Sequence, residues 1–454
     1  MNRNPASKAA RLCSVFVTLL ILVLVSWRSF ALESIVNPDQ YSVPADLSSV
    51  HFYLITVDVG DMVWDNFGHT ALRIYDENTG SDLVYNWGVF DASEGVVQFS
   101  FNFFKGIMNY SLGIHTPAQE FNMNRSQQRT LWQDKINLSN PQKEILYRRL
   151  QWNQQPENIV YPYQYFSDNC TTKVRDYLNE ALAGKLAASN AGITDKTFRQ
   201  QVQEHYESVA LVDFSLDILM NSNLDRNVSE WEEMFLPLSL RQNLLELDSD
   251  VAINGERQKL LSDSQIIMEF SPPNVEADPN KLASITLLAP VLLMFLMMKK
   301  IPMSYFATHS RIGLKMAGLN FRILGLLGLI TATFSGVYGV LMLASWFVSD
   351  HLDLHHNINL LLFWPTDIFG LLVALRWLFF CKPWPLTNNS TPFLNYYMIA
   401  HLLGMAVYAA LAFFELSSQS ILPIATSVVP GFALFTILVW IVGFEPAKPK
   451  TVFF

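Results

Sequence analysis

The sequence predicts an α+β fold for an exported domain, followed by an all-α bundle of about five transmembrane helices. Two observations support this prediction. Strand-like and helix-like segments of mixed polarity fill residues 32–270, whereas long apolar runs almost free of charge follow residue 282. A basic N-terminus with a short apolar stretch opens the chain, as it does in exported proteins.

Residues 1–31 are predicted to be a signal peptide or an N-terminal anchor. Basic residues precede LCSVFVTLLILVLVSW, which has the length of a signal-peptide core. Ser29–Ala31 offers a small-residue cleavage site, and a retained anchor is the alternative. In either case the residues that follow are exported.

The exported domain is predicted to open with a small antiparallel meander. Its segments are rich in β-branched and aromatic residues and are separated by turn residues; they are HFYLITVDV (51–59), HTALRIYD (69–76) and LVYNWGVF (83–90). Residues 126–155 and 205–247 are predicted to be mainly helical. Within the latter, FLPLSLRQNLLEL is expected to lie on the membrane surface or to form a core helix.

The clearest helix is predicted to begin at Cys170. Ser167, Asp168 or Asn169 is placed to cap it, and Gly184 is placed to end it. Farther on, the polar and proline-bearing segment 271–281 is a predicted linker to the membrane domain.

The membrane domain is predicted to span 282–446 and to leave a cytoplasmic tail at 447–454. The apolar runs are Ser284–Met298, Ile323–Val348, Ile358–Phe380, Phe393–Phe414 and Ile421–Phe444. Lys and Arg residues gather in alternate loops and in the tail, whereas SDHLDLHHN and ELSSQS contain none. The positive-inside rule therefore places residues 32–270 outside the cytoplasm.

Composition and cysteine positions narrow the functional classes. A formal net charge of −9 gives no basic footprint for nucleic acid. Of the three cysteines, Cys13 lies in the signal or anchor and Cys381 at the cytoplasmic end of a predicted span. Cys170 is then alone in the exported domain and has no partner for an intradomain disulfide. The histidines lack metal-ligand spacing, and no cofactor is expected.

Cys170 is the candidate nucleophile, because the N-terminus of a helix favours a thiolate. His69 is the candidate base: Gly68 precedes it, and it opens a predicted strand whose small Ala71 lets a helix approach. Asn86 on the next strand is the candidate orienting residue.

Secondary candidates and structural alternatives accompany these three residues. Asp82 and Tyr85 are weaker choices for the orienting residue, and the backbone N–H of Cys170 is a predicted oxyanion donor. Tyr85, Asn169, His355 and His356 are secondary candidates for lipid or substrate contacts. The structural alternatives are a buried, inert cysteine, a hydrogen-bonded core histidine and an asparagine that only ends a strand.

The order of these residues resembles a permuted papain-like arrangement. His precedes Cys, as in the branch that includes lecithin:retinol acyltransferase, whereas NlpC-type hydrolases have Cys first. The motifs FGHTALRI, VYNWGVF, YFSDNCTTKVRDYL, EEMFLPLSL and HHNINLLLFWP are similar to those of the Lnb family of lipoprotein N-acyltransferases. Trp364 and Pro365 stand where Asn-Pro is expected in that family.

This resemblance implies a transacylase of the bacterial inner membrane with a papain-like periplasmic domain. It would move a fatty acyl chain from a phospholipid or a diacylated lipoprotein to the N-terminal amine of a lipoprotein. By the same resemblance, Cys170 is the nucleophile and His69 the base, then the acid. The rival functions are a membrane-tethered NlpC-type cell-wall peptidase or amidase, a phospholipase or thioesterase, and a non-catalytic multispan assembly factor.

Overall fold

The computed structural model describes residues 41–90, 96–106, 108–253, 256–274, 279–296, 299–300, 314–315 and 318–445. The predicted signal peptide or anchor and the predicted tail at 447–454 lie outside the described residues, as do positions 275–278 of the predicted linker. The described chain is α+β, with a sheet-rich N-terminal domain and a helical C-terminal region, as the sequence predicts.

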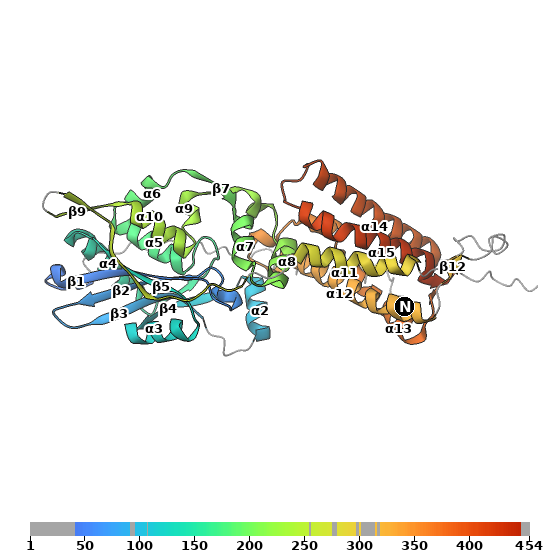
Figure 1. Ribbon diagram of the computed structural model, residues 1–454, viewed down its shortest axis with the longest axis horizontal. Helices are drawn as coiled ribbons and strands as arrows, with labels where there is room; N and C mark the ends of the chain where they lie inside the picture. The colour runs from blue at the N-terminus through green and yellow to red at the C-terminus, as the bar shows by residue number, and fades with distance from the viewer. Residues whose placement is uncertain are drawn as a thin grey trace, which may run out of the picture. The chain divides into compact units, whose positions relative to one another are not determined.

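An antiparallel sheet of seven strands lies at the centre of the described N-terminal domain (Figure 1). The strand order is β11-β5-β1-β2-β3-β4-β6. The strands are β1 (Val50–Val57), β2 (His69–Asp76), β3 (Asp82–Val89), β4 (Asn109–His115), β5 (Leu131–Ile136), β6 (Val160–Pro162) and β11 (Leu261–Met268). The predicted meander of β1, β2 and β3 is therefore confirmed.

The helix predicted across residues 126–155 is wrong in its first half. LWQDKI forms strand β5, and only α4 (Asn140–Asn153) is a helix. β5 pairs with β1 on one side and with β11 on the other. Pairing on both edges overrides local helix propensity, and the polar Asp134 is accommodated within this strand because Arg241 pairs with it.

Helices cover both faces of the sheet (Figure 1). Helix α5 (Cys170–Ala181) packs with α4 and α10 (Pro237–Glu246) on the face that presents Leu72. The opposite face presents Ala71, against which Phe121 of α3 (Pro117–Ser126) packs. Successive strand residues point to opposite faces, so the expectation that Ala71 admits the Cys170 helix is wrong.

The rest of the N-terminal domain is mainly helical after β6, as predicted for 205–247. The further elements after β6 are α6 (Lys185–Ser189), α7 (Phe198–Tyr206), α8 (Ala210–Leu219), η4 (Ser222–Asp225) and α9 (Glu230–Glu233), with the strand pairs β7 (Ile193–Thr197) and β8 (Asn227–Ser229), and β9 (Asp248–Ile253) and β10 (Glu256–Lys259). Helix α2 (Val96–Lys105) lies between β3 and β4. Leu240 and Leu244 of α10 are fully buried. Of the two alternatives for FLPLSLRQNLLEL, the structure therefore favours the core helix.

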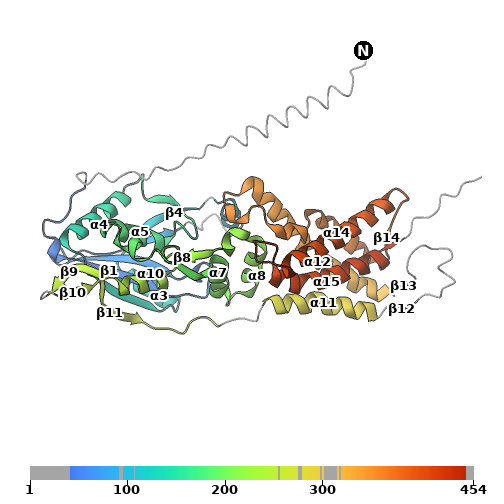
Figure 2. The same cartoon turned by 90° about the horizontal axis from the view of Figure 1, so that it is seen from above.

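The C-terminal region contains three described helices long and apolar enough to cross a membrane: α12 (Gly318–Val348), α14 (Ser390–Phe413) and α15 (Leu422–Val442). They lie alongside α11 (Pro279–Leu296), whose apolar part is shorter than these spans (Figures 1 and 2). Of the five predicted spans, three are thus supported by helices of sufficient length.

The predicted span at 358–380 is a broken one. Its segments Leu352–Leu361 and Pro365–Phe380 meet at an angle of 67° and count as a fourth span only if taken together. The second segment comprises η8 (Pro365–Phe369) and α13 (Gly370–Phe380). Pro365 lacks a backbone N–H, which favours the start of a new helix at this point.

Side-chain amides from the membrane region hold the C-terminal end of α8. Asn357 and Asn359 both donate hydrogen bonds to the Ile218 carbonyl, at 2.8 and 2.7 Å. Gln419 donates to the Met220 carbonyl at 3.1 Å. The last carbonyls of a helix have no intrahelical partner, and here buried amides provide one.

We predict that Arg241→Met destabilises the protein by about 3–5 kcal/mol, because it leaves a buried carboxylate unpaired. Asp134 is fully buried and accepts hydrogen bonds from Arg241 at 2.7 and 3.0 Å. The measurement is chemical unfolding of the full chain in detergent. Lys196→Met is the control; it breaks an exposed ion pair and is expected to cost less than about 1 kcal/mol. Equal losses in both variants would contradict the prediction.

Candidate functional site

The N-terminus of α5 is built by a side-chain cap. The side-chain oxygen Oδ1 of Asn169 accepts hydrogen bonds from the backbone N–H groups of Thr171 and Thr172 at 2.9 and 2.8 Å. Its Nδ2 donates to the carbonyls of Tyr165 and Phe235. Of the three predicted candidates, Asn169 is therefore the residue that caps the helix. Both atoms of its side-chain amide are used in hydrogen bonds within the domain and do not face a substrate. The helix begins at Cys170, as predicted.

A glycine positions His69 at the start of β2. Gly68 has φ +77°, and a Cβ at this position would lie 2.6 Å from the Val57 carbonyl oxygen. No other residue fits without displacing β1, because the left-handed region and the close approach both require glycine. The prediction of an unusual backbone just before His69 is confirmed.

The imidazole of His69 meets the thiol of Cys170. The two side chains hydrogen-bond each other, and His69 Nε2 contacts Asn86 Oδ1 at 3.0 Å. Since Nε2 is engaged by Asn86, Nδ1 is the nitrogen left for the sulfur. The structure thus brings together the three residues predicted as nucleophile, base and orienting group.

Mutual attraction shifts the pKa values of the pair toward an ion pair. Burial opposes charge on the sulfur, but the neighbouring His69 imidazolium outweighs it and lowers the pKa of Cys170 to about 7. Burial likewise opposes the imidazolium, but the Cys170 thiolate, the Glu120 carboxylate and the Asn86 hydrogen bond raise the pKa of His69 to about 9. Between these pH values the site holds a thiolate beside an imidazolium.

Further donors surround the sulfur. The backbone N–H of Thr70 donates to it, and the Thr171 hydroxyl lies 3.8 Å away. Among the hydrogen bonds of the described residues, none uses the backbone N–H of Cys170. The oxyanion role of this N–H stays a prediction.

A buried carboxylate that the sequence did not reveal extends the hydrogen-bonded series that begins at Cys170. Glu120 on α3 is fully buried and accepts from Asn86 Nδ2 at 2.9 Å and from Asn124 Nδ2 at 2.8 Å. His115 adds a contact to Asn86 Nδ2 at 3.2 Å. A glutamate in the first turn of a helix is ordinarily a dipole partner, so nothing in its sequence context signalled this role.

This hydrogen-bonded series of side chains therefore links elements from both faces of the sheet. It runs from Cys170 on α5 through His69 on β2 and Asn86 on β3 to Glu120 on α3. The Asn86 amide oxygen contacts His69, and its NH₂ group faces Glu120 and His115. These contacts fix the orientation of Asn86 and, through it, of the imidazole ring.

Some predicted residues lie elsewhere. Tyr85 is buried on the opposite face from Asn86, and its hydroxyl accepts from Gln154 at 2.8 Å. Asp82 forms a bidentate ion pair with Arg73. Neither is joined to His69. Tyr85 is next to Asn86 in the strand and so faces the other way, and Asp82 lies at the opposite end of β3.

The histidines of the outer loop belong to the membrane region. His355 Nε2 contacts the Ser349 carbonyl oxygen at 2.9 Å, and its own carbonyl accepts from Asn221. His356 packs on Trp346, with ring centroids 4.9 Å apart. No contact joins either histidine to Cys170 among the described residues, so the expected place beside the thiol is not supported.

The surroundings of the sulfur on its other side are aromatic. A Cβ built on Gly88 would lie 3.8 Å from Cys170 Cβ and 3.8 Å from the Tyr163 ring. Gly88 lies within an irregularity in the pairing of β3 with β4. Its φ of +90° is a conformation that favours glycine, and Cys170 and Tyr163 both lie beside it.

A line of rings leads from Tyr163 to the surface. Tyr110 lies 4.4 Å from Tyr163 between ring centroids, and Phe90 lies 5.2 Å from Tyr110. Trp64 follows at 6.4 Å from Phe90 and is 57% exposed, beside the similarly exposed Met62. Ring contacts thus connect the neighbourhood of Cys170 with an exposed tryptophan.

Comparison with known proteins bears on this domain. Residues 38–204 match the Lnb N-terminal periplasmic domain. The matched segment contains Cys170, His69, Asn86 and Glu120, and it supports the predicted Lnb resemblance for this part of the chain. No curated protein and no solved structure matches the chain. With the candidate spans, the match indicates a membrane protein whose N-terminal domain is of periplasmic type.

The described residues offer no group of three or more His, Cys, Asp or Glu side chains placed to hold a metal ion. The chemistry that the described site itself supports is nucleophilic attack by sulfur, with proton transfer through one imidazole.

We predict that alkylation of Cys170 by iodoacetamide reaches half its maximal rate at about pH 7, since the pKa of its thiol is lowered to that value. Below this pH the sulfur keeps its proton; above about pH 9 the imidazolium is lost. His69→Ala is expected to move the midpoint upward, because the imidazolium that opposes the effect of burial is lost and only the Thr70 and Thr171 donors remain. Peptide mass spectrometry gives the rates, with Cys381 as an internal reference. A wild-type midpoint near pH 9 would refute the ion pair.

We also predict that Glu120→Gln slows alkylation of Cys170 at pH 7 by roughly fivefold or more. The variant removes a charge that favours the imidazolium and faces the Asn86 NH₂ with a competing donor. The midpoint of the pH profile is the decisive readout, since a merely structural role would leave it in place. Asn122→Ala, exposed on the same helix, is the control. An unchanged midpoint in Glu120→Gln would show that Glu120 does not act on the Cys170–His69 pair.

Proposed function

We propose that the protein is a membrane-bound thiol acyltransferase. It transfers a fatty acyl chain from a phospholipid or a diacylated lipoprotein to the N-terminal amine of a bacterial lipoprotein. The observation that carries the proposal is the thiolate–imidazolium pair of Cys170 and His69, held by Asn86. The match of residues 38–204 to the Lnb periplasmic domain supports the lipoprotein branch of this chemistry.

In the first step the Cys170 thiolate attacks the carbonyl carbon of the acyl ester. The C–S bond forms, the ester C–O bond breaks, and the His69 imidazolium gives its proton to the leaving alcohol oxygen. The Cys170 and Thr70 backbone N–H groups lie at the helix and strand starts that flank the sulfur. A thioester on Cys170 and a neutral imidazole remain.

In the second step the free α-amine of the acceptor attacks the thioester. The amine loses a proton to His69 as the C–N bond forms, and the C–S bond breaks to restore the thiolate and the imidazolium. Asn86 keeps the ring oriented through both proton transfers. Water in place of the amine would give a hydrolase, so exclusion of water decides the outcome.

The surroundings favour a lipid over a soluble peptide. Aromatic side chains from Tyr163 to Trp64 pack in a row beside the site, which suits an acyl chain better than a polar cell-wall peptide. Helices able to cross a membrane hold the domain at the bilayer, where both proposed substrates reside. In this proposal the Cys-on-helix and His-on-strand geometry is the permuted papain-like one.

We predict that phosphatidylethanolamine with radiolabelled acyl chains leaves a hydroxylamine-sensitive label on the purified full-length protein. Peptide mapping is expected to place the thioester on Cys170. Adding a synthetic peptide with an N-terminal diacylglyceryl cysteine is expected to move the label to its amine. Cys381→Ser is the matched control and retains the label, whereas Cys170→Ser loses the thioester.

Other outcomes point to the rival functions. Release of free fatty acid with no transfer to the peptide amine indicates a lipase or thioesterase. Absence of any thioester, with cleavage of cell-wall peptides that depends on Cys170, indicates a peptidase. Full complementation of a deletion strain by both Cys170→Ser and His69→Ala indicates a non-catalytic factor and ends the proposal.

A further inference from the structure

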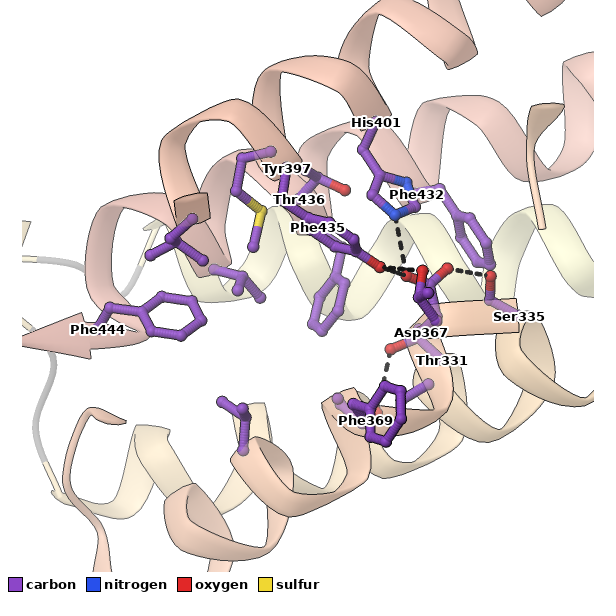
Figure 3. Close-up of a pocket in the computed structure, with 18 of the residues that line it drawn as sticks. Thr331, Ser335, Asp367, Phe369, Tyr397, His401, Phe432, Phe435, Thr436 and Phe444 are labelled. Atoms are coloured by element: carbon purple, nitrogen blue, oxygen red, sulfur yellow. Dashed lines mark hydrogen bonds and ion pairs between the residues drawn. The ribbon is translucent and has the colours of Figure 1, made fainter. Parts of the chain in front are cut away.

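A cavity of about 430 Å³ lies among the C-terminal helices (Figure 3). Its described lining is largely apolar, with phenylalanine the commonest residue, and comes from α12, η8, α13, α14, α15 and the strand residue Phe444. It is separate from the thiol site, because all its lining residues belong to the membrane region and Cys170 belongs to the N-terminal domain. The size is within the range of small-molecule sites.

One end of the cavity is polar. Asp367 of η8 accepts hydrogen bonds from Ser335 at 2.5 Å, Tyr397 at 2.7 Å and His401 Nε2 at 2.9 Å (Figure 3). The His401 ring also stacks on Trp364, with centroids 4.0 Å apart. Ionisable side chains inside a membrane are costly, and such a cluster points to a function for the space beside it.

The polar end lies at the centre of the bilayer. Ser335 is near the middle of the candidate span Asn320–Val348, and His401 is near the middle of Ser390–Phe413. Phe432, which also lines this end, is near the middle of Leu422–Val442. The positions of these residues along three separate helices thus all place the polar end at the middle of the membrane.

The other end lies at one membrane surface. Trp377, Phe393 and Phe444 line it. Trp377 is close to the end of α13, Phe393 is close to the start of α14, and Phe444 follows the end of α15. From Phe393 to His401, which contacts Asp367, the lining rises about 12 Å along α14, most of the depth of one hydrocarbon leaflet. The cavity therefore runs through about one leaflet.

Basic residues mark the surface at which the cavity ends. Arg376 and Lys382 lie at the end of α13, and Arg322 lies at the start of α12. By the positive-inside rule this is the cytoplasmic surface, where anionic phospholipids bind basic side chains. The thiol site is assigned to the opposite side.

We propose that this cavity is a binding site for one acyl chain of an anionic phospholipid from the cytoplasmic leaflet. The headgroup lies near Arg376, and the methyl end of the chain points toward Asp367. The lining consists of side chains against which an alkyl chain packs, and the length matches one leaflet. The bilayer supplies such chains at high local concentration, so an apolar space open to it is filled by them.

The Asp367 cluster closes the site at its inner end. A longer chain would have to pass a carboxylate already bonded to three donors on α12 and α14, and an alkyl group offers it no hydrogen bond. The cluster thus limits the chain length, and it ties the broken span to its neighbours. This lipid site is independent of the proposed transfer of acyl groups by Cys170.

The test uses the full-length protein in vesicles of phosphatidylethanolamine and phosphatidylglycerol. One trace probe is phosphatidylglycerol with a diazirine at the methyl end of one chain, and the other has it near the ester. After irradiation the methyl-end probe is expected to label peptides around Met405 and Phe432. The ester-end probe is expected to label peptides around Trp377 and Phe444.

Cavity-filling variants provide the contrast. Thr436→Phe and Val373→Phe place a ring in the cavity and are expected to reduce this labelling about fivefold. Leu403→Phe is the control, because Leu403 is 61% exposed on the outer side of α14. The rate of Cys170 alkylation and the melting temperature report correct folding of each variant.

Two results would overturn the assignment. One is labelling by both probes at the same positions in the wild type, since an inserted chain has a fixed direction. The other is undiminished labelling in Thr436→Phe and Val373→Phe. If acyl transfer by Cys170 is absent but the directional labelling is found, only the proposed function fails.

Discussion

The attraction between one thiolate and one imidazolium organises the N-terminal domain. Burial disfavours charge on both Cys170 and His69, and the charge on each favours the charge on the other. Glu120 and Asn86 add to the effect at His69, and the Thr70 and Thr171 donors add to the effect at Cys170. This mutual dependence requires that the start of α5 and the start of β2 be held in register. Asn169 fixes the first and Gly68 the second, with a cap and a left-handed turn that have few substitutes.

The pair lies at the end of the sheet, where a helix from one face can meet a strand residue that faces the other. Leu72 packs toward α5, whereas Ala71 and Asn86 are directed toward α3. A hydrogen-bonded series from Cys170 through His69 and Asn86 to Glu120 can therefore cross the sheet only past the ends of its strands. Gly88, with φ +90°, turns the backbone of β3 beside Cys170.

The membrane region contributes more than an anchor. Its buried amides Asn357, Asn359 and Gln419 replace water at the C-terminal carbonyls of α8, so the N-terminal domain is attached through directional hydrogen bonds. Farther along the same region, Asp367 is retained within an apolar cavity at the cost of burying a carboxylate. The HHNINLLLFWP motif is explained by the first of these features rather than by contact with the thiol.

The sequence by itself determined the α+β fold class, the meander of β1 to β3, the helix start at Cys170 and the grouping of that residue with His69 and Asn86. These follow from local rules: period-two alternation, capping, and the chemistry that a lone exported thiol requires. Only the tertiary structure decided that LWQDKI is a strand, that Glu120 completes the chain and that the span at 358–380 is broken. Each of these depends on partners distant along the chain, and a local pattern carries no record of the neighbour that will bury it.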